Sequence, residues 1–232
     1  MVKNNNTPRI SVNKLAEYMV AKGKRQRQIL SDQKFPRDFK GMYYKEATDA
    51  IALCIASNME NTSALERALR ILEQMPSDKI GTQRRITSNI DAIETFMTML
   101  DDIDLMGGSP KMGDASPAKL SIMNVAVSVR PEIVIKGQGK SGKKLIGAIK
   151  LHFPKTYSLD KEAASFASTI VQKYCHDLIA NDEETYAPYC QLIDIGSKTV
   201  HLGVKSTITR FREVEANCKT IAQLWPNITE DE

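Results

Sequence analysis

Apolar residues recur at helical spacing through the first hundred positions. Leu15, Met19 and Val20 form an early stripe, and a longer stripe runs from about Gln83 to Leu100. Residues three and four apart lie on one helix face, so this pattern predicts three or four amphipathic helices. We expect residues 1–100 to form a helical N-terminal region that packs on a core made by the rest of the chain.

The period changes to that of β-strands after residue 119. Residues 101–119 concentrate Gly, Pro and Ser in the run MGGSPKMGDASPAK, which is typical of a loop or linker. Pro131, which cannot donate a ladder hydrogen bond, should mark a joint between two strands. Residues 120–232 are therefore predicted to form an α/β core with a C-terminal helix. The expected elements are strands in 125–135 and 144–153, a helix over about 158–179 capped by Ser158, strands 189–195 and 199–204, and a helix over about 207–224.

Composition narrows the class of protein. The 232 residues are 42% hydrophobic and 26% charged, which suits a soluble globular protein. No window approaches the roughly 18 uninterrupted apolar residues of a membrane span, and the N-terminal run MVKNNNTPRI is polar. We therefore expect a cytoplasmic protein with no membrane contact. The widely spaced cysteines form no CxxC pair and are expected to be buried, reduced thiols: Cys54, Cys175, Cys190 and Cys218.

Positive charge is concentrated in two segments, although the net charge is only +4. No acidic residue lies between Ile133 and Leu159, and lysine side chains near phosphates add sequence-independent affinity for DNA or RNA. The alternative is a solvated turn whose lysines block strand aggregation. The candidate nucleic-acid-binding residues here are Lys136, Lys140, Lys143, Lys144 and Lys155. A second basic cluster, near the end of the first predicted helix, is either a phosphate clamp or ordinary exposed charge, and contains Lys22, Lys24, Arg25 and Arg27.

Gly137, Gly139 and Gly142 spell GxGxxG. In a dinucleotide-binding fold this motif lies between a strand and a helix, but here a strand follows it. The glycines therefore predict a hairpin turn.

Lys150 is the most informative single residue of the predicted strands. It alternates with Ala148 and His152, opposite the apolar face that carries Ile149. A lysine that points inward from a central strand is costly to bury without a partner, and Glu132 on the neighbouring run is a natural companion. The alternative is that the lysine extends to solvent at the end of the sheet.

The order helix, strand, strand, strand, helix, strand over roughly residues 83–204, with Pro131-Glu132 on one strand and Lys150 on the next, resembles the PD-(D/E)XK nuclease superfamily. The resemblance implies a mixed-sheet αβββαβ core and Mg²⁺-dependent hydrolysis of phosphodiesters. It assigns Glu132 to the metal, in place of the usual Asp, and Lys150 to the attacking water or the transition-state phosphate.

One position departs from the family pattern. Ala148 stands where the superfamily has Asp or Glu as the second metal ligand. Because some members supply that carboxylate from an adjacent helix, Glu162 is the candidate replacement, with Glu94 and Glu46 as alternatives.

The leading hypothesis is a nucleic-acid-processing protein of bacterial or phage-related origin, which cleaves DNA or RNA with Mg²⁺ if its site is intact. The second is a non-catalytic nucleic-acid-binding protein, or a partner subunit of a larger complex, in which the nuclease site is lost. The third is an interaction protein whose apolar helices, about residues 86–100 and 208–225, form a homo-oligomer interface.

Overall fold

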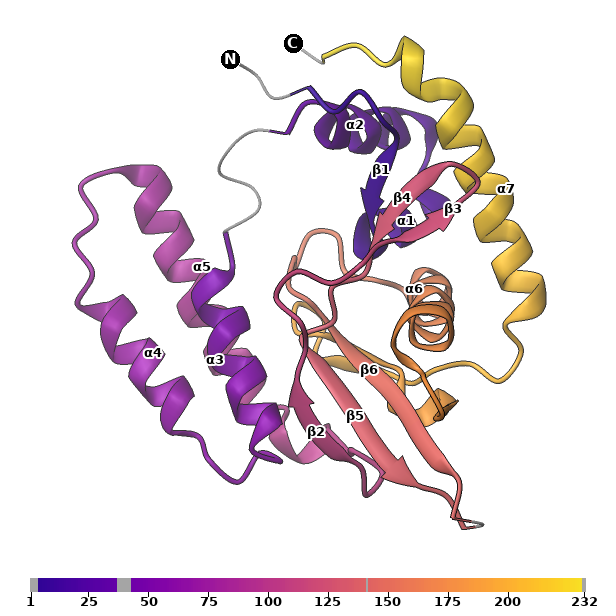
Figure 1. The fold of residues 1–232 in the computed structure, drawn as a ribbon. Coiled ribbons are helices and arrows are strands. Elements are labelled where there is room, and N and C mark those ends of the chain that lie inside the picture. The colour runs from indigo at the N-terminus through magenta and orange to yellow at the C-terminus, as the bar shows by residue number, and fades with distance from the viewer. Residues whose placement is uncertain (1–3, 37–42, 141, 231–232) are drawn as a thin grey trace.

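The protein is an α/β structure in which helices cover both faces of a mixed sheet (Figure 1). The computed structural model describes residues 4–36, 43–140 and 142–230. One face of the sheet is covered by α3 (Lys45–Ala56) and α5 (Ile80–Met97), and α4 (Ser63–Glu73) packs on these two helices on the side away from the sheet. On the other side lie α1 (Val12–Val20), α2 (Gly23–Lys34), α6 (Lys161–Tyr174) and α7 (Ile208–Leu224). The predicted α/β class is confirmed.

The larger sheet has the strand order β2-β5-β6-β8-β9, with β7 paired to the start of β6. Its central strands β6 and β8 are parallel, whereas β2 with β5, β5 with β6, and β8 with β9 are antiparallel. The order α5, β2, β5, β6, α6, β8 along the chain is thus helix, three strands, helix, strand, with β3 and β4 inserted after β2 and the short β7 inserted before β8. The bounds are β2 (Ser109–Met112), β5 (Ile133–Gln138), β6 (Lys144–His152), β7 (Glu184–Thr185), β8 (Gln191–Asp194) and β9 (Thr199–His201).

A smaller sheet joins the N-terminal segment of the chain to its middle. It has the order β1-β4-β3, in which β1 is parallel to β4 and β3 is antiparallel to it. Its strands are β1 (Arg9–Ser11), β3 (Leu120–Ile122) and β4 (Val125–Ser128). The segment expected to be wholly helical therefore contributes a strand, and its described residues, 4–36 and 43–100, hold five α-helices in place of the three or four expected.

Two apolar clusters lie on opposite faces of the larger sheet. Ile149 and Leu151 of β6 belong to the cluster under α3, α4 and α5, whereas Ala148 belongs to the cluster with α1, α6 and α7. Alternate residues of a strand point to opposite faces, so β6 is buried on both sides. The helical stripes considered for an oligomer interface face these intramolecular clusters, since Phe96 and Trp225 are buried in them.

Part of the predicted linker is a strand. Ser109–Met112 forms β2, an edge strand that pairs with Ile133–Lys136. Pro110 is tolerated there because an edge strand leaves one side of its ladder unpaired. The Gly- and Pro-rich composition predicts a loop here, but backbone pairing with β5 makes this part of the segment a strand.

Two local predictions have different outcomes. Pro131 lies between β4 and β5, which belong to different sheets, so the predicted strand joint is confirmed. The helix expected to start at Ser158 begins instead at Lys161, because the side chain of Asp160 accepts a hydrogen bond from the Ala163 amide at 2.8 Å and caps it. That helix continues into a short π-helix, Cys175–Ile179.

The glycine segment forms the turn of the β5–β6 hairpin, as predicted, with the Gly139 amide donating to the Lys143 carbonyl at 2.8 Å. All four cysteines are buried, as predicted, and free, and the sulfur atoms of Cys175 and Cys190 lie 4.0 Å apart. None of the helices in the described part of the chain is both long enough and apolar enough to span a membrane.

We expect Lys34→Met to lower the free energy of unfolding by about 2–4 kcal/mol, because hydrogen bonds from a charged group are worth about 1.5–3 kcal/mol. The buried Nζ of Lys34 donates to the carbonyls of Trp225 (2.8 Å), Pro226 (3.2 Å) and Ile228 (2.9 Å), so it ties α2 to the end of α7. Urea denaturation measures the change, with the exposed Lys219→Met on α7 as the control. Equal stability of the two variants would contradict this account.

Candidate functional site

Glu132 and Lys150 face each other across two neighbouring strands. β5 pairs with β6 through Ile133 and Ile149, which places Glu132, one residue before β5, opposite Lys150. The Lys150 Nζ lies 2.6 Å from Glu132 Oε1, and the side chains are 13% and 12% exposed. The predicted partnership of this lysine and this glutamate is confirmed.

Backbone groups hold both ends of the ion pair. The second carboxylate oxygen of Glu132 accepts a hydrogen bond from the Leu151 amide at 2.8 Å, and Lys150 Nζ donates to the Arg130 carbonyl at 2.9 Å. Arg130 has a φ of +42°, which turns the chain sharply just before Pro131. The pair is thus fixed on a rigid part of the fold, at the point where the chain passes from the smaller sheet to the larger one.

The position of the expected second carboxylate is filled by a core residue. Ala148 is fully buried, in the apolar cluster that also contains Ala163 and Phe166 of α6. A carboxylate at this position would be surrounded by apolar side chains.

The three replacement carboxylates lie elsewhere. Glu162 is exposed at the start of α6 and lines a cavity of about 1030 Å³ with His201 and Arg210, beside β9, which β8 separates from β6. Glu46 on α3 pairs with Arg85, and Glu94 is exposed on α5; both helices cover the opposite face of the sheet. The structure brings Glu132 and Lys150 together. The three candidate replacement carboxylates, Glu162, Glu94 and Glu46, do not lie beside this pair.

Glu132 fits a Mg²⁺ ion that is held by one protein carboxylate, with water and substrate as the other ligands. Within residues 4–36, 43–140 and 142–230, no three His, Cys, Asp or Glu side chains are grouped to hold a metal ion. Each oxygen of Glu132 accepts one hydrogen bond, so each keeps a lone pair. Because Mg²⁺ is often held by one or two carboxylates with waters and substrate phosphates, Glu132 suits an ion that the substrate helps to bind.

The lysines of the hairpin have acidic partners that are distant in sequence. Lys136 pairs with Glu183, Lys143 with Glu184 at 2.9 Å, and Lys144 with Asp182, over separations of 38 to 47 residues. The hydrogen bond from Lys136, together with one from the Asn181 amide, lowers the pKa of Glu183 to about 2. The charge of this strip is therefore largely compensated, although Lys140 is exposed at the turn.

The second basic cluster lies at the start of α2 and not on α1. The chain is extended at Ala21, which ends α1. Arg25 donates to Glu17 at 2.7 Å, and its guanidinium lies 3.8 Å from the centre of the Tyr157 ring. Arg27 is exposed on the same helix. Arg25 therefore contacts the loop after β6, a contact that the sequence did not reveal.

His152 is a further residue of this region that the sequence analysis treated only as a neighbour of Lys150. It is 2% exposed, and its Nε2 lies 2.7 Å from the Tyr157 carbonyl, so Nε2 carries the proton. Burial lowers the pKa of His152, against the opposing effects of this hydrogen bond and of Asp194. A neutral His152 thus holds the loop that follows β6.

Two more polar side chains anchor the same strand end. Asn13 of α1 donates to the Leu151 carbonyl at 3.0 Å, while its own Oδ1 is buried without a hydrogen-bond partner among the described residues. The fully buried Asp194 accepts from the Leu159 amide at 2.8 Å. These contacts join residues up to 138 positions apart, so no local sequence pattern signals them.

Comparison of the chain with protein-family models and with curated proteins gave no match. Function is therefore inferred from the geometry of the chain itself.

A double-mutant cycle with Glu132→Gln and Lys150→Met should give a coupling energy of about 1–3 kcal/mol, because each single change leaves the other charge mostly buried and unpaired. The comparison pair is Lys143–Glu184, whose side chains are 66% and 60% exposed and whose coupling should be clearly smaller, because solvent screens an exposed pair. Urea denaturation of the four chains in each cycle measures both values. Equal coupling of the two pairs would show that Glu132 and Lys150 are not held as described.

Stability should fall as the pH drops below about 6.5, the ordinary pKa of histidine. The pKa of His152 is lowered by burial in the folded protein, and so is that of His201. The unfolded chain therefore binds protons that the folded chain does not, with a slope of at most about 1.4 kcal/mol per pH unit for each proton.

The variant His152→Gln should show a smaller loss of stability between about pH 6.5 and 5 than the wild type. His176→Gln is the control, since His176 is exposed. Chemical denaturation across this pH range measures the slopes, and an unchanged slope in His152→Gln would contradict the burial argument.

Proposed function

We propose that this chain is a nucleic-acid-processing protein built on a PD-(D/E)XK-like core. The observation that carries the proposal is the cross-strand pair of Glu132, at the start of β5, and Lys150, within β6. The succession α5, β2, β5, β6, α6, β8, with an antiparallel β2-β5-β6 unit and β8 parallel to β6, supports the same core.

Lys150 is suited to handle a phosphate. An ammonium group has three N–H donors, and two of them are used, by Glu132 and by the Arg130 carbonyl. The third has no partner among the residues that the structure describes, so it can donate to a phosphate oxygen, where a fixed positive charge stabilises negative charge that develops in the transition state. Glu132 holds the ammonium in place and keeps a lone pair on each oxygen for a water molecule or an ion.

Mg²⁺, when bound, supplies an activated water and neutralises phosphate charge. In this chain Glu132 would hold it together with waters and the substrate phosphate. Lys150 would then orient the scissile phosphate through its remaining N–H donor. Under this version the protein hydrolyses phosphodiester bonds of DNA or RNA.

A second version is binding without cleavage. The observation that favours it is Ala148, which is buried in the apolar core at the place of the expected second carboxylate. The Glu132–Lys150 pair would then contact the nucleic-acid backbone, either in this protein alone or as a subunit of a larger complex.

The two versions are separated by incubating labelled single- and double-stranded DNA and RNA with the purified protein and Mg²⁺ or Mn²⁺. If the protein is a nuclease, Lys150→Met and Glu132→Gln should each reduce cleavage by roughly 100-fold or more, the usual cost of removing one group that stabilises transition-state charge. Lys173→Met is the control, because Lys173 makes an exposed ion pair with Asp177 on the far end of α6.

Metal-dependent cleavage that survives in both site variants would contradict a role for this pair. Binding by wild-type protein with no cleavage of any substrate would support the non-catalytic version, provided that Lys150→Met weakens the binding. Failure of the wild type to bind any of the four substrates would contradict both versions.

A further inference from the structure

A cavity of about 350 Å³ lies at the carboxyl ends of the parallel strands β6 and β8. Its floor is formed by the segments that leave these strands, and they touch, because a Cβ added to Gly196 would lie only 2.7 Å from the Pro154 carbonyl oxygen. Crevices at the carboxyl ends of parallel strands are the usual ligand positions of open α/β sheets. The volume falls within the roughly 300–1,000 Å³ of small-ligand pockets.

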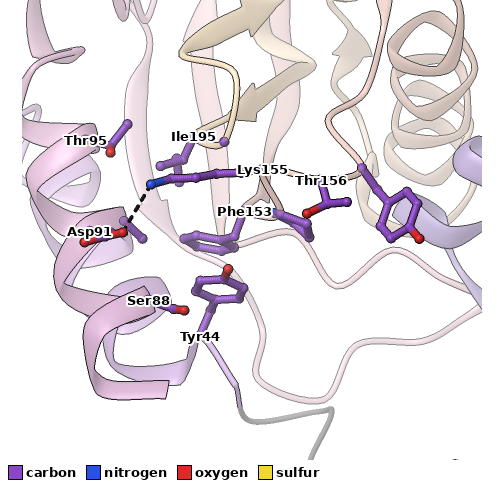
Figure 2. A pocket seen from close by; sticks show the side chains of 12 residues that line it. Tyr44, Ser88, Asp91, Thr95, Phe153, Lys155, Thr156 and Ile195 are labelled. Atoms are coloured by element: carbon purple, nitrogen blue, oxygen red, sulfur yellow. Dashed lines mark hydrogen bonds and ion pairs between the residues drawn. The ribbon is translucent and has the colours of Figure 1, made fainter. Parts of the chain in front are cut away.

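Aromatic rings form one wall of this cavity. Tyr44 and Phe153 are stacked, with ring centres 4.9 Å apart and planes inclined by 12° (Figure 2). Tyr157, from the same loop as Phe153, is 41% exposed and also lines the cavity. Planar faces of this kind suit the stacking of a nucleobase.

A cation lies beside the rings. Lys155 points toward Asp91 of α5 (Figure 2), and the two charged groups are 3.1 Å apart. Their side chains are 64% and 46% exposed, so this is a weak surface pair that a phosphate can replace as partner of the lysine. Hydroxyl groups of Ser88 and Thr156 complete the polar part of the lining.

A second cavity, of about 260 Å³, adjoins the first. Thr156 and Tyr157 line both, whereas Lys22, Arg25 and Glu17 line only the second, and there Arg25 pairs with Glu17 and lies over the Tyr157 ring. Lys22 precedes the first turn of α2 and makes no side-chain capping bond, so it leaves the positive end of this helix uncapped by a side chain. The two cavities together place cations on both sides of Tyr157.

We propose that these two adjoining cavities, together the β6–α6 groove lined by Tyr44, Phe153, Lys155, Tyr157, Arg25 and Lys22, bind unpaired nucleotides of a single-stranded nucleic acid. Bases stack against the face of Tyr157 that Arg25 does not cover, beside the Tyr44–Phe153 pair, and phosphates lie near Lys155 at one end and Lys22 at the other. The proposal rests on the proposed function and names its substrate class.

The groove and the Glu132–Lys150 pair are linked through β6, although neither Glu132 nor Lys150 lines the two cavities. Lys150 and His152 lie two residues apart on one face of β6, and His152 holds the groove loop through the Tyr157 carbonyl. Aromatic platforms interleaved with cations are how proteins bind single strands without sequence preference, whereas duplexes keep their bases stacked on each other. The arrangement therefore favours single-stranded over double-stranded substrates.

The test is fluorescence anisotropy of the full chain with a labelled 12-nucleotide single strand and the matching duplex, in EDTA so that no cleavage occurs. Tyr157→Ala should weaken single-strand binding roughly 5- to 100-fold, the range found when a stacking ring is removed. Lys155→Ala should weaken it less and reduce the salt slope by about 0.7, as expected for one lost phosphate contact.

Two variants serve as matched comparisons. Tyr186 is 38% exposed, close to the 41% of Tyr157, and Tyr186→Ala should bind within about twofold of the wild type, since no base stacks on it. Lys143→Ala tests the rival surface, because Lys143 is as exposed as Lys155 and also has one acidic partner.

The outcomes separate the groove from the proposed function. Suppose that the wild type binds nucleic acid, but Tyr157→Ala and Lys155→Ala bind the single strand as tightly as the wild type does, or Lys143→Ala loses as much affinity as Lys155→Ala. The proposal that the groove is the binding site is then overturned, and the proposed function stands. If AMP binds in a Lys155-dependent way while no oligonucleotide does, the groove is a nucleotide site and the proposed function is overturned. If neither AMP nor any oligonucleotide binds, both are overturned.

Discussion

The burial of β6 on both faces is the constraint on which the rest of the structure depends. This strand lies between two apolar clusters, yet Lys150 and His152 point from it into one of them. Polar groups in such a place are costly unless they are paired. Glu132 therefore has to meet Lys150, and the loop after β6 has to return so that the Tyr157 carbonyl meets His152. The same requirement fixes the candidate site and the groove beside it.

The functional groups are consequently held by backbone as much as by side chains. Glu132 is fixed by the Leu151 amide, Lys150 by the Arg130 carbonyl, and the loop by Asp194 through the Leu159 amide. In the proposed function, Lys150 of β6 would contact a phosphate, and Tyr157 of the loop that follows β6 would contact a base. Chemistry on the sheet and recognition in the groove are thus parts of one arrangement in the proposed function.

The sequence predicted what depends on local pattern. Helical stripes located α5 and α7, the alternation around Lys150 assigned its face, and the cost of a buried lysine identified Glu132 as its partner. It could not predict contacts set by distant segments. Three such contacts arise from tertiary packing. Acidic residues 182–184 pair with the hairpin lysines, and β2 pairs with β5 although its segment is rich in Gly and Pro. Asn13 and Arg25 contact the end of β6 and the loop that follows it.

The most direct measurement is hydrogen–deuterium exchange of the full chain with and without a saturating 12-nucleotide single strand, followed by mass spectrometry. The account predicts new protection in residues 150–159 and at the start of α2, where Lys22 and Arg25 lie, with little change in the β5–β6 hairpin tip. Protection confined to the hairpin and residues 182–186, or absent from every segment under conditions where the oligonucleotide is bound, would contradict it.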